Sequence, residues 1–338
     1  MVSSQLREVC VFGAGPAGLS VAARLLDRGR DVVVLDRPPR ARAWGGESFS
    51  ASIREPLAAL GLWDGFARAG HVEGHERQSA WGGEPWAESA ILRPNGTLWH
   101  VDRERFDDDL RTAICERADV IVPYRRLDAV RREAGKWRVT LDGALEVVAS
   151  FLVDATGRLR ALGHRLGARI EADDRLLGLT ASVTRDDSPA ALRSMMIEAT
   201  PFGWWYAAPT PRGHVLAMFT DADLAPSEVR RRLRPVAANS AFMHVDAGEG
   251  WLPVGDAFAS HDPLCGWGVH RALSNGLVLA DALDALVSRG DAAALEDYRQ
   301  LCRQQYQRYL AGLHRRYALE RRWPGAPFWQ RRQRIASA

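Results

Sequence analysis

Three glycines near the amino terminus have the spacing of a diphosphate-binding turn. Gly13, Gly15 and Gly18 form G-x-G-x-x-G between an apolar run and a segment with helical spacing. In this pattern the first glycine makes a tight turn, the second lets a diphosphate approach the backbone, and the third lets the helix pack on the strand. The helix expected from Pro16 offers free N–H groups and the positive end of its dipole. Asp36 ends the next expected strand, where its carboxylate could accept the hydroxyls of an adenosine ribose, so the expected ligand is a dinucleotide.

Two further segments could place an acid or a base beside that ligand. Residues 251–276, WLPVGDAFASHDPLCGWGVHRALSNG, read as a glycine-rich turn that opens a helix. His261, next to Asp262 in this turn, is the first candidate for proton transfer. A loop histidine in contact with solvent is an equally good interpretation. Glu47, in the GGES loop ahead of an expected helix, is the second candidate, although a carboxylate at a helix N-terminus also explains it.

An aromatic segment could bind a flat substrate. The stretch SMMIEATPFGWWYAAPT ending at Thr210 is rich in aromatic and apolar residues and predicts a strand. Because side chains alternate along a strand, Trp204 and Tyr206 share a face opposite Trp205. That face is expected to line a substrate pocket; packing within the sheet is the alternative.

Composition excludes several classes of protein. The 338 residues include 45 Lys and Arg against 42 Asp and Glu, a balance too even for a dedicated nucleic-acid binder. The four cysteines show no C-x-x-C and no metal-ligand spacing, so we expect reduced thiols and no metal site. No apolar run approaches the roughly 18 residues that span a bilayer, and the first strand begins too early to leave room for a signal peptide. These features predict a cytoplasmic protein without a membrane partner.

Several motifs along the chain together resemble one family. They are GAGPAG at 13–18, GGES at 45–48, VDRERF at 101–106, DATG at 154–157, and Gly255 and Asp256 followed by PLCGWG at 263–268. Their types and order resemble the FAD-dependent aromatic hydroxylases, or class A flavin monooxygenases. Within that superfamily the chain is most similar to the branch of tryptophan halogenases and of flavoproteins that hydroxylate tryptophan in quinone-cofactor maturation.

The resemblance implies an α/β fold: a Rossmann-like FAD-binding domain, an inserted and mostly antiparallel β-sheet substrate domain, and a helical C-terminus. The FAD-binding domain is expected over 1–75, 100–172 and 250–290, and the substrate sheet over 76–99 and 173–249. Helices and an arginine-rich tail are expected over 291–338. That tail could dock an acidic carrier or leader peptide, or it could be a solvated helix face.

The resemblance also implies which residues hold FAD. Gly13, Gly15 and Gly18 would hold the diphosphate, Asp36 the adenosine ribose, and Arg103 the diphosphate or ribose. Asp256 would bond the ribityl chain, and Cys265, Gly266, Trp267 and Gly268 would line the pyrimidine side of the ring. The other residues expected to contact the cofactor are Gly46 and Ser48 of the GGES loop, Gly255 and Pro263. The helix after Pro263 would place its positive end near the negative edge of reduced flavin. Arg103 and Asp256 could instead be ordinary cap or ion-pair residues.

In the resembling enzymes reduced FAD and O2 form a C4a-hydroperoxide that hydroxylates an electron-rich ring. We therefore expect a monooxygenase acting on a tryptophan, indole or phenol-like ring. Only about thirty residues separate Asp223 from Gly255, which predicts an open site suited to a ring tethered to a peptide or carrier protein. No second G-x-G-x-x-G is present, so electrons would come from visiting NAD(P)H or from a separate flavin reductase.

Three alternatives remain. A halogenase of the resembling branch needs a lysine between flavin and substrate, whereas the only lysine, Lys136, lies in a turn before a strand. The halogenase signature W-x-W-x-I-P is also altered, to WWYAAP from Trp204 to Pro209. A dehydrogenase or ene-reductase of the geranylgeranyl reductase type is the second alternative. A flavin-binding partner protein without turnover is the third.

Overall fold

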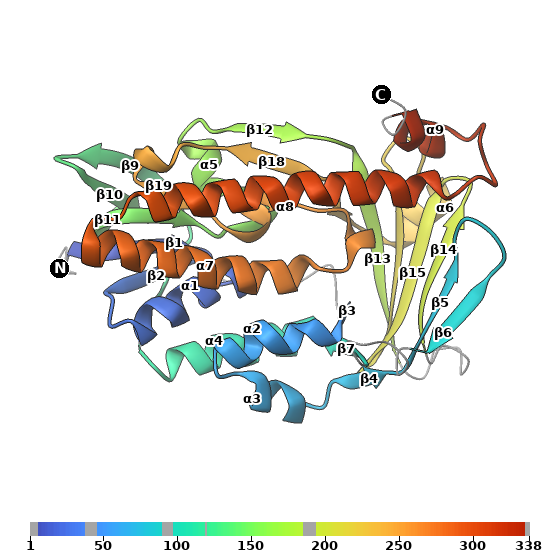
Figure 1. The fold of residues 1–338 in the computed structure, drawn as a ribbon, viewed down its shortest axis with the longest axis horizontal. Coiled ribbons are helices and arrows are strands. Elements are labelled where there is room, and N and C mark those ends of the chain that lie inside the picture. Colours follow the sequence, from blue (N-terminus) through green and yellow to red (C-terminus); the bar gives the residue numbers. More distant parts are fainter. Residues whose placement is uncertain (1–5, 38–45, 90–96, 119, 185–193, 335–338) are drawn as a thin grey trace.

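The computed structural model describes residues 6–37, 46–89, 97–118, 120–184 and 194–334. Across these ranges the chain forms two seven-stranded sheets and two three-stranded sheets (Figure 1). The two large sheets stand at opposite ends of the molecule, and the long helix α8 (Ala293–Ala318) runs along both. This arrangement confirms the predicted α/β fold with its helical C-terminus.

The first large sheet carries the nucleotide-type turn. Its strands lie in the order β8 (Ile121–Pro123), β2 (Val32–Asp36), β1 (Leu6–Phe12), β11 (Leu145–Asp154), β10 (Lys136–Leu141) and β9 (Leu127–Glu133), and β19 (Trp251–Pro253) also pairs with β11. The pairs β2–β8, β1–β2, β1–β11 and β11–β19 are parallel, and their apolar side chains are buried. Parallel strands covered on both faces need such continuous apolar runs, which explains VCVF in β1 and VVVL in β2.

The second large sheet is the inserted one. Its strands lie in the order β17 (Arg234–Ala237), β13 (Leu176–Thr184), β16 (Gly213–Asp221), β15 (Gly203–Thr210), β14 (Met195–Thr200), β5 (Glu76–Ala80) and β6 (Trp86–Ser89). Only the β14–β5 pair is parallel among these strands. All seven fall inside 76–99 and 173–249, while the domain boundaries themselves stay a prediction.

Two small sheets join the large ones. One consists of β12 (Arg169–Ala172), β18 (Ala241–His244) and β20 (Ala259–Ser260), and the other of β3 (Gly46–Phe49), β7 (Leu98–Asp102) and β4 (Val72–Gly74). The expectation that the GGES motif is a loop was wrong for residues 46–48, which lie in β3. Cross-strand pairing with β7, which sets Glu47 opposite Val101, makes this segment extended.

The remaining helices pack around these sheets. They are α1 (Pro16–Asp27), α2 (Arg54–Ala59), α3 (Trp63–Arg68), α4 (Arg103–Cys115), α5 (Ala161–Arg165), α6 (Ser227–Arg232), α7 (Gly268–Arg289) and α9 (Pro327–Arg334). Helices α1 and α7 pack closely, and Ser20 Oγ donates to the Leu273 carbonyl at 2.7 Å. No helix within the described ranges is long and apolar enough to cross a membrane.

Helix α8 joins the two large sheets through tyrosine hydroxyls. Near its start, Tyr298 Oη donates to the Pro253 carbonyl of β19 at 3.0 Å. Near its end, Tyr317 Oη accepts from Trp204 Nε1 of β15 at 3.1 Å. The helix therefore fixes the first sheet relative to the second.

Arginines of the C-terminal tail make ion pairs within the chain. Arg331 and Arg332 each bond Asp221, at 2.8 and 2.7 Å, and Arg322 bonds Glu320 at 2.6 Å. These three side chains stabilise the packing of the tail, so a role in docking a partner remains only a hypothesis for the others.

Candidate functional site

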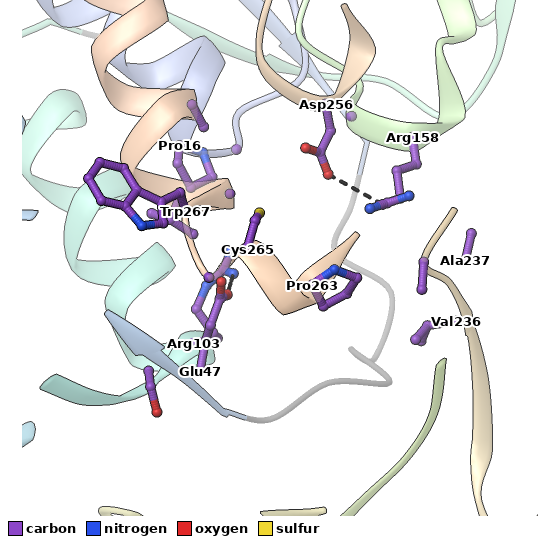
Figure 2. A pocket seen from close by; sticks show the side chains of 18 of the residues that line it. Pro16, Glu47, Arg103, Arg158, Val236, Ala237, Asp256, Pro263, Cys265 and Trp267 are labelled. Atoms are coloured by element: carbon purple, nitrogen blue, oxygen red, sulfur yellow. Dashed lines mark hydrogen bonds and ion pairs between the residues drawn. The ribbon is translucent and has the colours of Figure 1, made fainter. Parts of the chain in front are cut away.

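A cavity of about 700 Å³ extends from the glycine turn to the inserted sheet. One end is formed by the turn after β1, the end of β2 and the loop around Pro263. The other end is formed by strands β5, β6, β14, β15 and β16. The cavity brings together most of the residues that the sequence singled out, and Figure 2 shows part of its lining.

The three motif glycines are required for different reasons. At Gly13, whose φ is +103°, an added Cβ would stand 2.5 Å from the Ala155 carbonyl oxygen, and at Gly18 it would stand 2.0 Å from that of Gly13. These two glycines are needed for the chain to pack. An added Cβ at Gly15 would meet no protein atom within 4 Å, and φ there is −84°. Only a ligand lying on this backbone would require glycine at that position, as a dinucleotide diphosphate would.

Asp36 lies at the same end of the cavity. Its Oδ1 accepts the N–H of Ala14 at 3.0 Å, and its Oδ2 is paired with Arg111. A carboxylate offers about four lone-pair sites, so both contacts leave capacity for ribose hydroxyls. The same carboxylate therefore holds the glycine turn and faces the cavity.

The turn before α7 forms another wall. Residues Pro263–Cys265 make a 3₁₀ turn, and Gly266 follows with a φ of +64°. Trp267 precedes α7 without a side-chain cap, and Gly268 lines the cavity, so N–H groups of the first helical turn are available to a ligand. Burial raises the pKa of the Cys265 thiol, whose Sγ accepts from Arg271 at 2.9 Å, so this cysteine is a packing group rather than a thiolate.

Asp256 faces this turn across the cavity. Its carboxylate lies 3.4 Å from Arg158 Nε, and both side chains line the cavity (Figure 2). Gly255 has a structural role, because its φ is +61° and an added Cβ would stand 2.8 Å from Ala17 Cβ. Gly46 is similar, since its added Cβ would stand 2.3 Å from Thr210 Cγ2. Neither Gly46, Gly255 nor Gly18 is among the residues that line the described cavity.

Glu47 and Arg103 form an ion pair at the cavity wall (Figure 2). Arg103 also lies 3.3 Å from Asp107, whereas its buried Nε has no partner in the part of the chain that the structure describes. A buried donor without a partner is costly and indicates a missing acceptor. FAD phosphate or ribose oxygens fit this position, and Glu47 fits the role of orienting the guanidinium.

Ser48, His100 and Tyr206 form a second polar group at the cavity, and the sequence did not predict that they lie together. Ser48 Oγ lies 2.8 Å from His100 Nδ1 and 2.7 Å from Tyr206 Oη. Ser48 and Tyr206 line the cavity, and His100 is fully buried behind them. Burial lowers the pKa of His100 to about 4, so the imidazole is neutral at physiological pH. His100 could not be identified in advance because it joins Ser48 only through the pairing of β3 with β7.

His261 does not face the cavity. Its ring packs against Tyr309 with centroids 4.4 Å apart and against Tyr306 at 5.6 Å, and its side chain is buried. Burial and the nearby Arg271 and Arg158 hold the pKa of His261 well below its usual value. The geometry gives no support to direct proton transfer by His261, and the alternative of solvent contact was wrong. It is a core residue of the loop.

Aromatic side chains form the far wall. Trp204 is buried and stacks on Phe219 with centroids 4.1 Å apart, and Trp81 meets Trp204 edge-on at 6.3 Å. Trp204 and Tyr206 both line the cavity. Trp205, on the other face of β15, is not among the lining residues. Trp81 is a further wall residue that the sequence analysis missed because it lies outside any regular strand.

The only lysine is remote from this wall. Lys136 begins β10, at the far side of the first large sheet, and its Nζ donates to Ser150 Oγ at 2.8 Å on the surface. The cavity therefore has no lysine.

Comparisons with known proteins agree with this geometry. Residues 7–231 match the family described as FAD binding domain. LodB of Marinomonas mediterranea, named as an FAD-dependent oxidoreductase, is 28% identical over an alignment of 365 positions that covers 98% of each chain.

Two solved structures share the fold. The flavin-dependent halogenase CmlS superposes with a TM-score of 0.82 at 22% identity, over 97% of this chain and 68% of that one. The peptidyl tryptophan dihydroxylase QhpG superposes with a TM-score of 0.76 at 24% identity, over 97% and 79%. Because this FAD binding domain spans more than half of the sequence, the chain belongs to that family and is an FAD-dependent oxidoreductase.

Proposed function

We propose that this flavoprotein is a monooxygenase that hydroxylates the ring of a tryptophan or another indole. The observation that carries the proposal is the continuous cavity, which joins the glycine turn to a wall of aromatic side chains. FAD would lie along Gly15, Asp36, Arg103, Asp256 and the Pro263 turn. Reduced FAD and O2 would together supply the oxygen atom that is transferred to the ring.

The aromatic wall suits a flat, electron-rich substrate. Trp204 and Phe219 stack, Trp81 stands edge-on to Trp204, and these rings line one side of the cavity. Ring pairs of this kind favour offset or edge-to-face contacts with a further aromatic ring. An aliphatic isoprenoid chain has no need for this wall, which is the reason to prefer a hydroxylase over an ene-reductase.

The group Tyr206–Ser48–His100 is the acid–base system that we propose in place of His261. Neutral His100 can accept the hydroxyl hydrogen of Ser48, which in turn accepts that of Tyr206. Tyr206 lines the cavity, and we propose that its oxygen also accepts the N–H of the indole. The three residues would orient the ring. As positive charge develops on the ring during oxygen transfer, its N–H proton would pass to Tyr206, the proton of Tyr206 to Ser48, and that of Ser48 to His100 Nδ1.

A tethered ring is the proposed form of the substrate. Trp86 lines the cavity although its exposed fraction is 43%, so the cavity opens to the surface beside β6. An aromatic side chain of a peptide can enter there while its backbone stays outside. The peptidyl substrate in the name of the fold relative QhpG is consistent with this proposal.

Halogenation is the second candidate, because the halogenase CmlS superposes with a higher TM-score, 0.82, than QhpG, 0.76. Lys136, bonded to Ser150 at the protein surface, argues against it. No other lysine exists in the chain to carry an activated halogen to the ring.

Product analysis tests these functions directly. FAD-loaded protein would be supplied with NADH, or with a separate flavin reductase, under ¹⁸O2 with bromide present. Free tryptophan, N-acetyltryptophanamide and tryptophan-containing peptides would serve as substrates. We expect peptide products heavier by one or two ¹⁸O atoms. A brominated product would establish the halogenase instead, and a change of two hydrogens would establish a dehydrogenase.

A further inference from the structure

One tyrosine hydroxyl connects two walls of the cavity. Tyr317 Oη, on α8, donates to Asp262 Oδ2 at 2.6 Å and accepts from Trp204 Nε1 at 3.1 Å. Each of the three residues is 1% exposed. Trp204 belongs to the aromatic wall. Asp262 immediately precedes the flavin-side turn, which is the 3₁₀ turn of Pro263–Cys265. The three side chains, far apart in the sequence, thus form one buried polar chain.

Asp262 fixes the position of the turn. Its Oδ1 caps the turn by accepting the N–H of Leu264 at 2.9 Å, and its own N–H donates to Tyr309 Oη at 2.7 Å. With Tyr317 on Oδ2, both carboxylate oxygens are occupied. Pro263, Leu264 and Cys265 line the cavity, so a shift of the Asp262 carboxylate would move this wall.

Trp204 is held at the other end of the chain. Its ring stacks on Phe219, and its buried N–H depends on the Tyr317 hydroxyl for an acceptor. Loss of that acceptor would leave a desolvated donor, which favours rotation of the indole. The plane of the aromatic wall therefore depends on Tyr317.

Charge around the hydroxyl favours the observed arrangement. The Arg332 guanidinium lies 5.4 Å from the centroid of the Tyr317 ring while it bonds Asp221. A cation over a tyrosine ring is stabilising when both are desolvated. It also offsets part of the cost of the buried Asp262 carboxylate, which would be high without partners.

We propose that Tyr317 and Asp262 are positioning residues. Together they fix the aromatic wall relative to the flavin-side turn, so that a bound ring lies in the correct position against FAD. The part that concerns the ring rests on the proposed function, whereas the part that concerns the turn and FAD does not. Neither residue is among those lining the cavity, so their effect acts through Trp204 and the turn.

Two matched tyrosine variants test the proposal. Tyr317→Phe removes the central hydroxyl. Tyr306→Phe removes a hydroxyl of the same helix that also donates to a carboxylate, that of Asp173, which does not line the cavity. Because hydrogen bonds to charged groups are strong, we expect Tyr317→Phe to weaken FAD binding about tenfold. It should also shift the visible circular dichroism of bound FAD and lower the yield of hydroxylated product per O2 consumed. Tyr306→Phe should match the wild type in all three measurements.

A double-mutant cycle adds a second test. Asp262→Ala should reproduce the FAD effect, and its combination with Tyr317→Phe should be strongly non-additive, because both act through the same chain. Combined with Tyr306→Phe, its effect should be additive. Additive behaviour of the first pair, or equal FAD binding and dichroism in the two tyrosine variants, would overturn the proposal. If no ring is hydroxylated at all, the proposed function fails, but the FAD measurements still decide the role of Tyr317.

Discussion

A methyl group at Gly18 would stand 2.0 Å from the carbonyl oxygen of Gly13, a distance that backbone atoms cannot accommodate. At Gly15, between them in the sequence, a methyl group would meet no protein atom within 4 Å. The motif therefore combines glycines that the fold requires with one that only a ligand would require.

This difference predicts opposite outcomes for two alanine variants. Gly15→Ala should fold with a wild-type unfolding midpoint for the FAD-free protein but should lose at least tenfold in FAD affinity, because its methyl group would displace the diphosphate. Gly18→Ala should fail to accumulate as folded protein, because helix α1 could no longer pack on the turn. Absorbance of the purified proteins near the flavin bands and thermal unfolding measure both effects. Tight FAD binding by Gly15→Ala would show that the diphosphate lies elsewhere.

His261 is predicted to affect stability rather than chemistry. His261→Ala removes ring contacts with Tyr306 and Tyr309 and should lower the free energy of unfolding by about 1–3 kcal/mol, as large-to-small core changes do. Turnover per bound FAD should remain within a few-fold of the wild type. Urea unfolding and product formation, measured on the same FAD-loaded preparation, separate the two effects. A loss of a hundredfold in turnover at full FAD occupancy would return His261 to a catalytic role.

The contrast between these sites explains what the sequence could predict. The glycine turn and Asp36 lie within one contiguous strand–helix–strand unit, so their spacing alone predicts their geometry. Ser48, His100 and Tyr206 come from three segments that meet only through the β3–β7 pairing and the inserted sheet. Tyr317 reaches Asp262 only because α8 spans both large sheets. Such contacts depend on tertiary pairing, for which a single sequence gives no periodic signal.

The hydroxyl group of Tyr206 should matter only for rings that carry a removable proton. Tyr206→Phe and Ser48→Ala are expected to lower turnover of an indole substrate by about a hundredfold, at the lower end of the range for general acid–base catalysis. The N-methylated form of the same peptide substrate is the control, because it has no N–H to donate. Its turnover should change little in either variant. Equal losses with both substrates would show that the hydroxyls only shape the cavity.

Glu47 is expected to act through Arg103. Glu47→Gln keeps a polar group of the same size but removes the charge that holds the guanidinium, so FAD affinity should fall several-fold. The dependence of turnover on pH should be unchanged at saturating FAD. Titration of the FAD-free protein with FAD and a pH–rate profile provide the two measurements. If the profile lost its acidic limb in this variant, Glu47 would be the group that accepts the proton instead.

The titrations of Asp262 and His100 should change the free energy of unfolding in opposite directions as pH varies. Burial raises the pKa of Asp262 from 3.8 to about 6, so the folded state holds a proton that the unfolded state releases as pH rises from about 4 to 6. The free energy of unfolding therefore falls across that interval by about 3 kcal/mol, because one pKa unit corresponds to about 1.36 kcal/mol. Burial lowers the pKa of His100 from 6.5 to about 4, which destabilises the folded state by a similar amount as pH falls through the same interval.

Between about pH 4 and 6 these two contributions have opposite signs and similar sizes. Asp262→Asn removes the first contribution and leaves His100. The stability of the variant relative to the wild type should therefore rise with pH up to about 6 and then level off, whatever constant cost the lost hydrogen bonds add. Urea unfolding of the FAD-loaded proteins at half-unit pH steps measures this difference. Parallel profiles for the two proteins would mean that the Asp262 carboxyl titrates at its ordinary value, with Tyr317 and Leu264 stabilising its charge as fully as water does.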